Sequence, residues 1–295
     1  MTKIAAVVVT YNRKALLEEC LEAILNQKFS TCDVVVVDNC STDGTGDFVK
    51  GLSNHRIVYR NTGKNLGGAG GFNYGMRLGT ELGYEYLWIM DDDCIPTDTA
   101  LNELLKAQEK VGDFGFLSSK VLWKDGSVCL MNRQRRTMYK NIDVEGTTGV
   151  ERIVMASFVS FLLPTSVIRE LGLPIKEFFI WTDDWEFSRR ISRKYRCYFV
   201  NSSVVVHKSD VNMAANIAKE SPERLFRFNY MYRNEVFLYR REGVAGWGYV
   251  LLRFCYHLLK VLAKSKEDRV KRITIIWQGL LTGLSFNPKI EYVEE

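Results

Sequence analysis

A short apolar run that ends in three adjacent aspartates constrains the fold of this chain more than any other stretch. Residues Leu87–Met90 are large and apolar, which is typical of a buried strand, and Asp91, Asp92 and Asp93 follow at once. Three neighbouring carboxylates repel one another and lose solvation if they stay unpaired. A hard divalent cation such as Mg2+ or Mn2+ compensates this charge, because it prefers oxygen ligands. A solvated acidic turn before Pro96 is the alternative.

Further apolar runs alternate with helical patterns along the first third of the chain. Strands are expected at Ile4–Val9, Asp33–Val37, Arg56–Arg60 and Leu87–Asp91. The glycine-rich segment Asn65–Asn73 opens a helix that is expected to continue to Leu82. This alternation predicts an α/β fold with a mostly parallel sheet and right-handed crossovers. Because ligands bind beyond the carboxyl ends of such strands, Asp38 and Asp91–Asp93 are expected to meet in one cleft.

The sequence from the acidic run to Asp210 is expected to complete this sheet. The strand-like segments are Phe114–Leu117, Val121–Trp123, Ile153–Leu163, Cys197–Val200 and Val204–Val206. Helices are expected at Thr165–Leu171, which Gly172 closes, and from Asp183 to about Lys194. Residues 133–149 are polar and weakly patterned, so we expect a mobile loop there.

Composition narrows the class of protein. The 295 residues are 46% hydrophobic and 25% charged, which is ordinary for a globular chain with a sizeable core. Seven cysteines without a CxxC pair are typical of reduced thiols in a cytosolic protein. Ile4–Val9 is too short for a signal-peptide core, and no apolar run is long enough to span a bilayer. The net charge of +5 is mild and the basic residues form no dominant patch, so a nucleic-acid partner is not expected.

The character of the sequence changes after Asp210. We therefore expect one domain at residues 1–215 and a C-terminal helical region at residues 216–295. Trp247–Leu262 and Ile273–Leu284 are apolar segments that alternate with basic residues. This mixture favours contact with a membrane surface, and a packed helical subdomain or a dimer interface is the alternative.

Two polar segments that follow predicted strands carry groups suited to nucleotide binding. Asp38 can accept hydrogen bonds from a nucleobase or ribose, or it can act as a turn residue or helix cap. Gly67–Gly71 lets backbone N–H groups approach a phosphate closely at a helix N-terminus. A tight strand–helix turn explains the same glycines, because the run is neither a Walker A loop nor a GxGxxG pattern.

A second group of acids opens a predicted helix. Asp183, Asp184 and Glu186 offer a carboxylate that can act as general base on an acceptor hydroxyl, or they complement the helix dipole. His207 follows a predicted strand and is either a metal ligand or a structural histidine.

Together these segments resemble the family 2 glycosyltransferases, which have the Rossmann-like GT-A fold, over roughly residues 3–240. The matching motifs are Val7–Arg13, the DN-S-DGT segment Asp38–Thr45, the N-x-GGAGG loop Asn65–Gly71, the D-x-D segment Asp91–Asp93, the acidic pair Asp183–Asp184 and the late histidine His207. Tyr230, Arg233 and Asn234 match a Tyr-x-x-Arg-Asn helix of bacterial polysaccharide members.

The resemblance implies a role for each matched position. It implies donor binding by Thr10, Tyr11, Asn12, Arg13, Asp38, Asn65, Gly68, Asp91 and Asp92. It implies a Mn2+ or Mg2+ site formed by Asp91, Asp93 and His207. It implies that Asp184 is the catalytic base and that the acceptor is bound by Trp181, Asp183, Trp185 and Glu186. Core packing is the alternative for both tryptophans.

Galactofuranosyltransferases are the most similar subgroup, because their F-I-x-W-D-D-A-E segment resembles Phe179–Glu186 apart from Thr182 and Trp185. The resemblance implies inverting transfer of galactofuranose from UDP-galactofuranose to a hydroxyl of a lipid-linked glycan in cell-surface polysaccharide synthesis. Rhamnosyl transfer from dTDP-rhamnose is one alternative, and a non-catalytic nucleotide-sugar-binding or assembly protein is another. The expected location is the cytoplasm, peripheral to the inner face of the cytoplasmic membrane.

Overall fold

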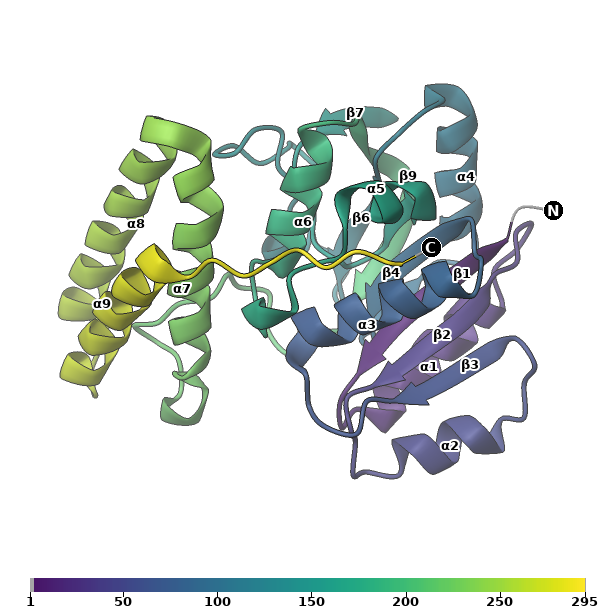
Figure 1. The fold of residues 1–295 in the computed structure, drawn as a ribbon, viewed down its shortest axis with the longest axis horizontal. Helices are drawn as coiled ribbons and strands as arrows, with labels where there is room; N and C mark the ends of the chain where they lie inside the picture. The colour runs from purple at the N-terminus through teal and green to yellow at the C-terminus, as the bar shows by residue number, and fades with distance from the viewer. Residues whose placement is uncertain (1–2, 295) are drawn as a thin grey trace.

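The computed structural model describes residues 3–294, whose strands form one mixed sheet of nine strands flanked by helices (Figure 1). The strands of the first half are β1 (Ile4–Thr10), β2 (Asp33–Asp38), β3 (Ile57–Asn61) and β4 (Tyr86–Asp91). They are parallel and lie in the order β3-β2-β1-β4, which confirms the predicted α/β fold. Thr10 pairs with Asp38 and Val9 with Asp91, so the carboxyl ends of β1, β2 and β4 share one edge.

Helices cover both faces of this sheet and create two apolar cores. They are α1 (Lys14–Leu25), α2 (Thr45–Gly51), α3 (Gly67–Glu81), α4 (Ala100–Val111), α5 (Thr165–Leu171) and α6 (Asp183–Ser192). Ala6 and Val8 of β1 belong to the core formed with α1 and α4. Val7 and Val9 belong to the opposite core, formed with α3, α5 and α6. Because β1 is buried on both faces, it needs an apolar side chain at nearly every position.

The second half of the sheet differs from the prediction in its strand boundaries. Its strands are β5 (Cys94–Pro96), β6 (Leu117–Trp123), β7 (Val150–Ile153), β8 (Phe161–Pro164) and β9 (Cys197–His207). The segments Phe114–Leu117 and Val121–Trp123 were predicted as two strands, but residues 117–123 form the single strand β6. Likewise, Cys197–Val200 and Val204–Val206 both belong to the single strand β9. The polar residues inside them lie at a register shift, where Ser119 pairs with Val200 and Lys120 with Val204. Their hydroxyls are satisfied there: a 2.7 Å hydrogen bond joins Ser119 to Ser203, and Ser203 donates to the carbonyl of Ala100.

Residues 133–149 lack a helix or strand, as predicted, but their first part is firmly attached to the fold. Gln134 is buried and donates from Nε2 to the Ser119 carbonyl at 2.7 Å. Arg135 is also buried and donates from Nη1 to the Tyr239 hydroxyl at 2.8 Å. These buried polar contacts disfavour the mobility that the polar composition predicts for this part of the loop.

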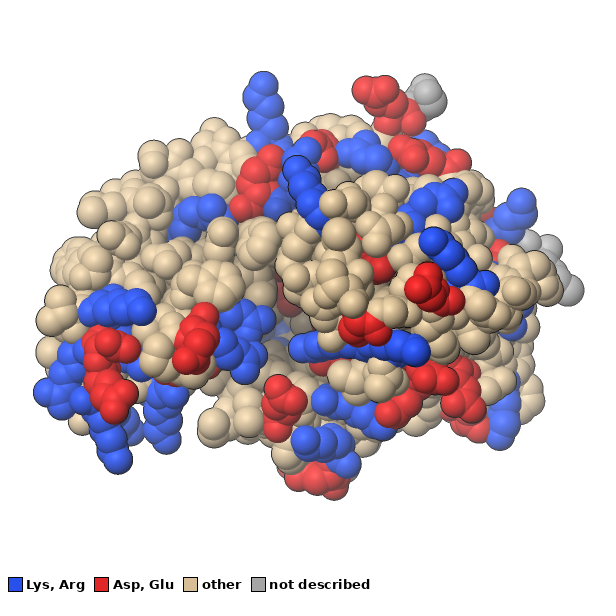
Figure 2. Space-filling model, turned by 90° about the horizontal axis from the view of Figure 1, so that it is seen from below, with Lys and Arg blue, Asp and Glu red and all other residues tan. Residues whose placement is uncertain are grey.

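The C-terminal part is helical, and its apolar core also includes Met138 and Met155 from the sheet-bearing part. It contains α7 (Arg227–Tyr239), α8 (Gly243–Lys264) and α9 (Arg269–Ser285), which lie together at one end of the molecule in Figure 1. Short 3-10 turns occur at η1 (Leu130–Asn132), η2 (Lys176–Phe178), η3 (Pro222–Arg224) and η4 (Arg240–Glu242). In Figure 2 this end carries large uncharged areas, with basic side chains and some acidic ones at one edge.

The last residues depart from the predicted helical region, and the boundary at residue 215 stays a prediction. After α9 the chain is extended and runs back along α3 (Figure 1). The Glu291 carboxylate forms ion pairs with Arg77 and Lys176, and its carbonyl accepts from the Leu173 N–H. Val293 is buried in the core beneath α3. These contacts explain why residues 287–294 pack against the sheet-bearing part of the chain instead of extending α9.

Candidate active site

The acidic end of β4 lies beside the end of β9. Asp91 is the last residue of β4, and the pairing of Cys94 with His207 aligns β5 with the last residue of β9. One ligand atom from each of Asp91, Asp93 and His207 lies within 4.8 Å of the other two. The structure therefore brings together the three predicted metal ligands, although 114 residues separate Asp93 from His207 in the sequence (207 minus 93).

Positive groups compensate the carboxylates of this cluster. Asp93 lies 3.1 Å from His207 Nε2 through Oδ1 and 2.7 Å from Arg13 Nη1 through Oδ2. Burial opposes protonation of His207, but its hydrogen bond to Asp93 and the charges of Asp93 and Asp91 raise its pKa to about 10. Burial and the Asp93 charge raise the pKa of Asp91 to about 7. The site thus holds protons that a bound cation has to displace.

The second nitrogen of His207 fixes the orientation of the ring. Nδ1 lies 2.7 Å from Asn132 Oδ1, and Asn132 Nδ2 donates to the Ser157 hydroxyl at 3.0 Å. Because Asn132 Oδ1 can only accept, Nδ1 carries a hydrogen, and Nε2 is directed at the carboxylates. This is the arrangement of a metal-binding histidine with a hydrogen-bonded outer partner. Sequence reasoning missed Asn132, which lies in the short turn η1 and has no local motif.

Asp92 shares Arg13 with Asp93 and joins the end of β4 to the end of β1. Its Oδ2 accepts from the Thr10 hydroxyl at 2.7 Å, and its Oδ1 lies 3.3 Å from Arg13 Nη1. Burial, partly offset by Arg13, raises the pKa of Asp92 to about 6. Asp92 thereby positions Thr10 and Arg13, two of the predicted donor-binding residues, at the edge of the sheet.

Asp38 organises the loop at the end of β2. It is fully buried and accepts from the Ser41 N–H at 2.8 Å, the Tyr59 hydroxyl at 2.6 Å and Asn61 Nδ2 at 3.2 Å. Asn12 joins the same loop by accepting from the Thr42 N–H at 2.7 Å, and its neighbour Tyr11 is 44% exposed. The turn-residue alternative thus accounts for these contacts of Asp38. Tyr59 and Asn61 were not predicted, because their register against β2 follows from the sheet alone.

The glycines at the start of α3 are required by close packing. A Cβ on Gly67, whose φ is +72°, would lie 2.1 Å from the Phe179 carbonyl oxygen. A Cβ on Gly71 would lie 2.5 Å from Val9 Cγ1. Asn65 accepts from the Gly67 N–H at 2.8 Å, whereas Gly68 faces open space. The tight-turn alternative therefore explains most of this run, and Gly68 is its one member with room for a ligand beside it.

Asp184 is the acid of the second cluster that lies within electrostatic reach of the first. Burial, with the charges of Asp183 and Asp91, raises the pKa of Asp184 well above its usual range. Asp183 is more deeply buried, and burial raises its pKa to about 7. Glu186 points elsewhere: it pairs with Arg190 at 2.9 Å. These contacts give Glu186 a structural role that explains its presence without an acceptor.

Both predicted tryptophans are half-buried against other side chains. The Trp185 ring lies under the Arg135 guanidinium, 3.6 Å from its central carbon. The Trp181 ring packs edge-on against Phe228 of α7 and lies 5.1 Å from the Arg227 guanidinium. Core packing thus accounts for much of each ring, and only the remaining exposed part is free to meet a sugar.

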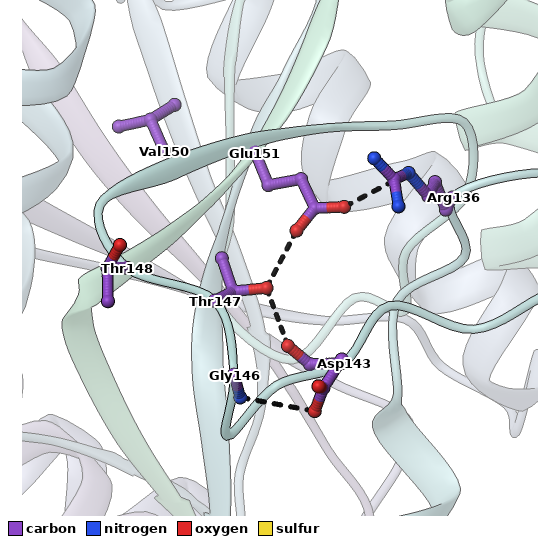
Figure 3. A pocket seen from close by; sticks show the side chains of 7 residues that line it. All are labelled: Arg136, Asp143, Gly146, Thr147, Thr148, Val150 and Glu151. Carbon is purple, nitrogen blue, oxygen red and sulfur yellow. Dashed lines mark hydrogen bonds and ion pairs between the residues drawn. The ribbon is translucent and has the colours of Figure 1, made fainter.

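A separate surface pocket contains none of the predicted site residues. It measures about 430 Å³ and is formed by residues 136–151 (Figure 3). Its polar groups bind one another, because the Thr147 hydroxyl donates to Glu151 at 2.7 Å and Glu151 pairs with Arg136 at 3.3 Å. The cluster of Asp91, Asp93 and His207 therefore lies at the sheet edge, outside this pocket.

Curated relatives of this chain are glycosyltransferases. Over 198 residues it is 30% identical to the galactofuranosyltransferase GlfT1 of Mycolicibacterium smegmatis, a match that spans 64% of this chain and 65% of the relative. Over 162 residues it is 34% identical to the GalNAc(5)-diNAcBac-PP-undecaprenol beta-1,3-glucosyltransferase of Campylobacter jejuni, covering 54% and 49% of the two chains. The chain thus spans less than two thirds of the length of either relative.

Solved structures share the fold at low sequence identity. Staphylococcus aureus TarS 1–349 in complex with UDP has a TM-score of 0.57 at 15% identity, over 97% of this chain and 72% of that one. The mannosyltransferase PcManGT from Pyrobaculum calidifontis, in complex with GDP-Man and Mn2+, has a TM-score of 0.54 at 18% identity, over 96% and 73%. The model of the family described as "Glycosyl transferase family 2" matches residues 5–148. Residues 5–148 are therefore similar in sequence to glycosyl transferase family 2, and the chain has the GT-A fold.

Proposed function

We propose that this protein transfers a sugar from a nucleotide diphosphate donor to an acceptor hydroxyl, with inversion at the anomeric carbon. The observation that carries the proposal is the gathering of three metal-binding side chains at one sheet edge, with Asp184 as the proposed base beside them. Asp91, Asp93 and His207 offer ligand atoms within 4.8 Å of one another, and Asp184 lies close enough to respond to the Asp91 charge. A cation site and a nearby base are the two parts that such a transfer needs.

The donor set of the first group fits a divalent cation. Two buried carboxylates supply hard oxygen ligands, and the imidazole of His207 makes Mn2+ a better match than Mg2+, which is held almost entirely by oxygen. When bound, the cation would supply Lewis-acid stabilisation of the charge that develops on the leaving diphosphate. Arg13, whose side chain is 47% exposed, adds a second positive charge at the same edge.

Asp184 is the proposed base. Its half-buried carboxylate accepts the Trp185 N–H at 2.7 Å through Oδ1, which fixes the direction of that oxygen. Burial makes this carboxylate more basic than an exposed one, which favours proton removal from a hydroxyl. Asp183, whose carboxyl is more deeply buried, and the exposed parts of Trp181 and Trp185 are proposed to bind the acceptor.

For the donor we propose UDP-galactofuranose, with dTDP-rhamnose as the alternative. Similarity to GlfT1 and the Phe179–Glu186 segment support galactofuranose. The loop of Asn12, Asp38 and Ser41 is proposed to receive the nucleobase and ribose, with Thr10, Tyr11, Asn65 and Gly68 beside it. For the acceptor we propose a lipid-linked glycan in cell-surface polysaccharide synthesis, which the name of the Campylobacter relative supports. A non-catalytic nucleotide-sugar-binding or assembly protein is the rival.

The helical region is proposed to rest on the cytoplasmic membrane surface, where such an acceptor is found. No helix in residues 3–294 is both long enough and apolar enough to cross a membrane. However, α8 exposes a stripe of apolar residues: Val244, Leu251, Leu252, Tyr256, Leu259 and Leu262. In α9, Val270, Trp277, Leu281 and Leu284 are exposed in the same way. Four exposed basic residues lie where α8 connects to α9, and their charge suits anionic lipid headgroups: Lys264, Lys266, Arg269 and Lys271.

A donor screen tests the proposed reaction. UDP-galactofuranose, dTDP-rhamnose and UDP-pyranoses are offered with a lipid-linked acceptor, and nucleotide release is measured. We expect release from UDP-galactofuranose above all others, stopped by EDTA and restored by Mn2+ or Mg2+. Tight binding of a donor without any acceptor-dependent release would favour the non-catalytic rival.

Asp184→Asn should abolish transfer while nucleotide binding persists. The amide has the size of the carboxylate but cannot take a proton, and general-base catalysis contributes about 100- to 10,000-fold to a rate. Turnover and the Kd for UDP with Mn2+ are measured for both proteins. Glu186→Gln, which alters the ion pair with Arg190, is the matched control and should keep most of the turnover. Normal turnover by Asp184→Asn would exclude Asp184 as the base.

The affinity for Mn2+ should rise with pH. Between pH 6 and pH 8, His207 (pKa about 10) keeps its proton and Asp91 (pKa about 7) loses one, so a cation that needs both groups deprotonated binds better at higher pH. We expect a gain of about tenfold or more over this range, measured by calorimetry in a buffer that does not bind metal. An affinity independent of pH would show that the cation binds elsewhere.

Vesicle cosedimentation tests the membrane surface. The double variant Leu252→Glu, Leu259→Glu puts charges on two α8 side chains that are 71% and 66% exposed, so it should fold normally. We expect the unchanged protein to sediment with phosphatidylglycerol-containing vesicles and the variant to bind about tenfold less, because apolar insertion is lost. Leu82→Glu is the control, because it puts a charge on a 45% exposed leucine outside α8 and α9. A stable dimer in which the second copy covers α8, and which does not bind vesicles, would contradict the proposal.

A further inference from the structure

The loop that leads into Asp183 and Asp184 has an unusual backbone. Phe179, Trp181 and Thr182 have φ values of 63°, 64° and 71°, in the left-handed region that side chains with a Cβ disfavour. None of the three is glycine, asparagine or aspartate. Such a run persists only if its surroundings hold it, and backbone strain of this kind gathers at functional sites.

Asn234 of α7 holds the loop through three main-chain carbonyls. Its side chain is fully buried, and Nδ2 lies 3.0, 3.2 and 2.9 Å from the carbonyl oxygens of Phe178, Ile180 and Trp181. Carbonyls only accept hydrogen bonds, so the amide nitrogen has to face them. The amide oxygen faces the other way and accepts from Arg233 Nε at 3.0 Å. The contacts therefore determine the orientation of the amide on both sides.

Arg233 completes this attachment. Its Nη2 donates to the Glu177 carbonyl at 2.5 Å and to Asn234 Oδ1 at 2.9 Å. The flat guanidinium lies 3.9 Å from the centre of the Phe286 ring, which belongs to the chain after α9. Arg233 thus joins the loop, α7 and the C-terminal segment in one contact.

The opposite side of the loop touches the donor side of the proposed active site. The Phe179 carbonyl accepts from the Ala69 N–H at 3.2 Å and leaves no room for a Cβ at Gly67. Asn39, next to Asp38, donates from Nδ2 to the Gly67 carbonyl at 3.0 Å. The strained loop is therefore held between α7 on one side and the start of α3 on the other.

We propose that Arg233 and Asn234 are positioning residues, which hold residues 178–182 in this conformation and thereby fix the position of Asp184 at the start of α6. The proposal rests on the proposed function for the role of Asp184, but the attachment itself does not. Neither residue touches the proposed cation or donor positions, so both act through the loop. The helical region thereby sets the geometry of the base as well as contributing a surface.

Asn234→Asp is the direct test. It replaces the donor Nδ2 by an oxygen that repels the three carbonyls, with almost no change in volume. We expect hydrogen exchange of the amides in residues 178–186 to become at least about tenfold faster, kcat to fall about 100-fold, and the Kd for UDP with Mn2+ to stay within about threefold. Asn229→Asp, the same change on α7 at a residue bonded only to the Phe226 carbonyl, is the matched control and should leave all three unchanged.

Arg233→Gln separates positioning from folding if Asn234→Asp fails to fold. It keeps a donor but removes the link to Glu177, so kcat should fall while nucleotide binding and the exchange of β1 and β4 amides stay normal. Unchanged exchange of residues 178–186 in the folded variants, or loss of folding in both, would overturn the proposal. If the variants show faster amide hydrogen exchange but the unchanged protein has no transferase activity, the attachment of the loop is retained and the proposed function is rejected.

Discussion

The arrangement of this molecule depends on holding three like charges together at the carboxyl end of β4, beside the end of β9. At an effective dielectric constant of about 20, two carboxylates roughly 4 Å apart repel by about 4 kcal/mol. Arg13 and the His207 imidazolium offset this repulsion between Asp91, Asp92 and Asp93. Asn132 keeps the His207 ring in place for the same purpose. The cluster is therefore ready to exchange protons for a cation, which is what a metal-dependent transfer requires.

The position of Asp183 and Asp184 depends on a balance between backbone strain and hydrogen bonds in the preceding loop. Three left-handed residues before α6 cost on the order of 1–2 kcal/mol each. Hydrogen bonds contribute about 1 kcal/mol each to stability, so the two N–H groups of Asn234 Nδ2, shared among three carbonyls, and the contact of Arg233 with Glu177 offset about 3 kcal/mol of this strain. Gly67 allows the close approach from the other side. The helical region and the sheet edge thus share control of the position of Asp184.

Local sequence patterns predicted the parts that depend on local chemistry. Continuous apolar runs identified β1, β2 and β4, and the strand pairing puts Asp38 and Asp91 at the same edge of the sheet, on either side of β1. The patterns failed where long-range contacts decide. Asn132 meets His207 across 75 positions and Asn234 meets Phe178 across 56, and neither asparagine has a local signal for its partner. For the same reason, the buried serines of β6 and β9 read as breaks in the sequence but continue the strands in the structure.

The most direct measurement of the central claim is the ligand set of a bound cation. Electron spin-echo spectroscopy of the protein with Mn2+ detects the magnetic coupling of a directly bound imidazole nitrogen. The account predicts one such nitrogen in the unchanged protein, its loss in His207→Gln, and its retention in His257→Gln, because His257 is bound to Tyr232 in the helical region. Bound Mn2+ without a nitrogen ligand in the unchanged protein, or with one that survives His207→Gln, would contradict it.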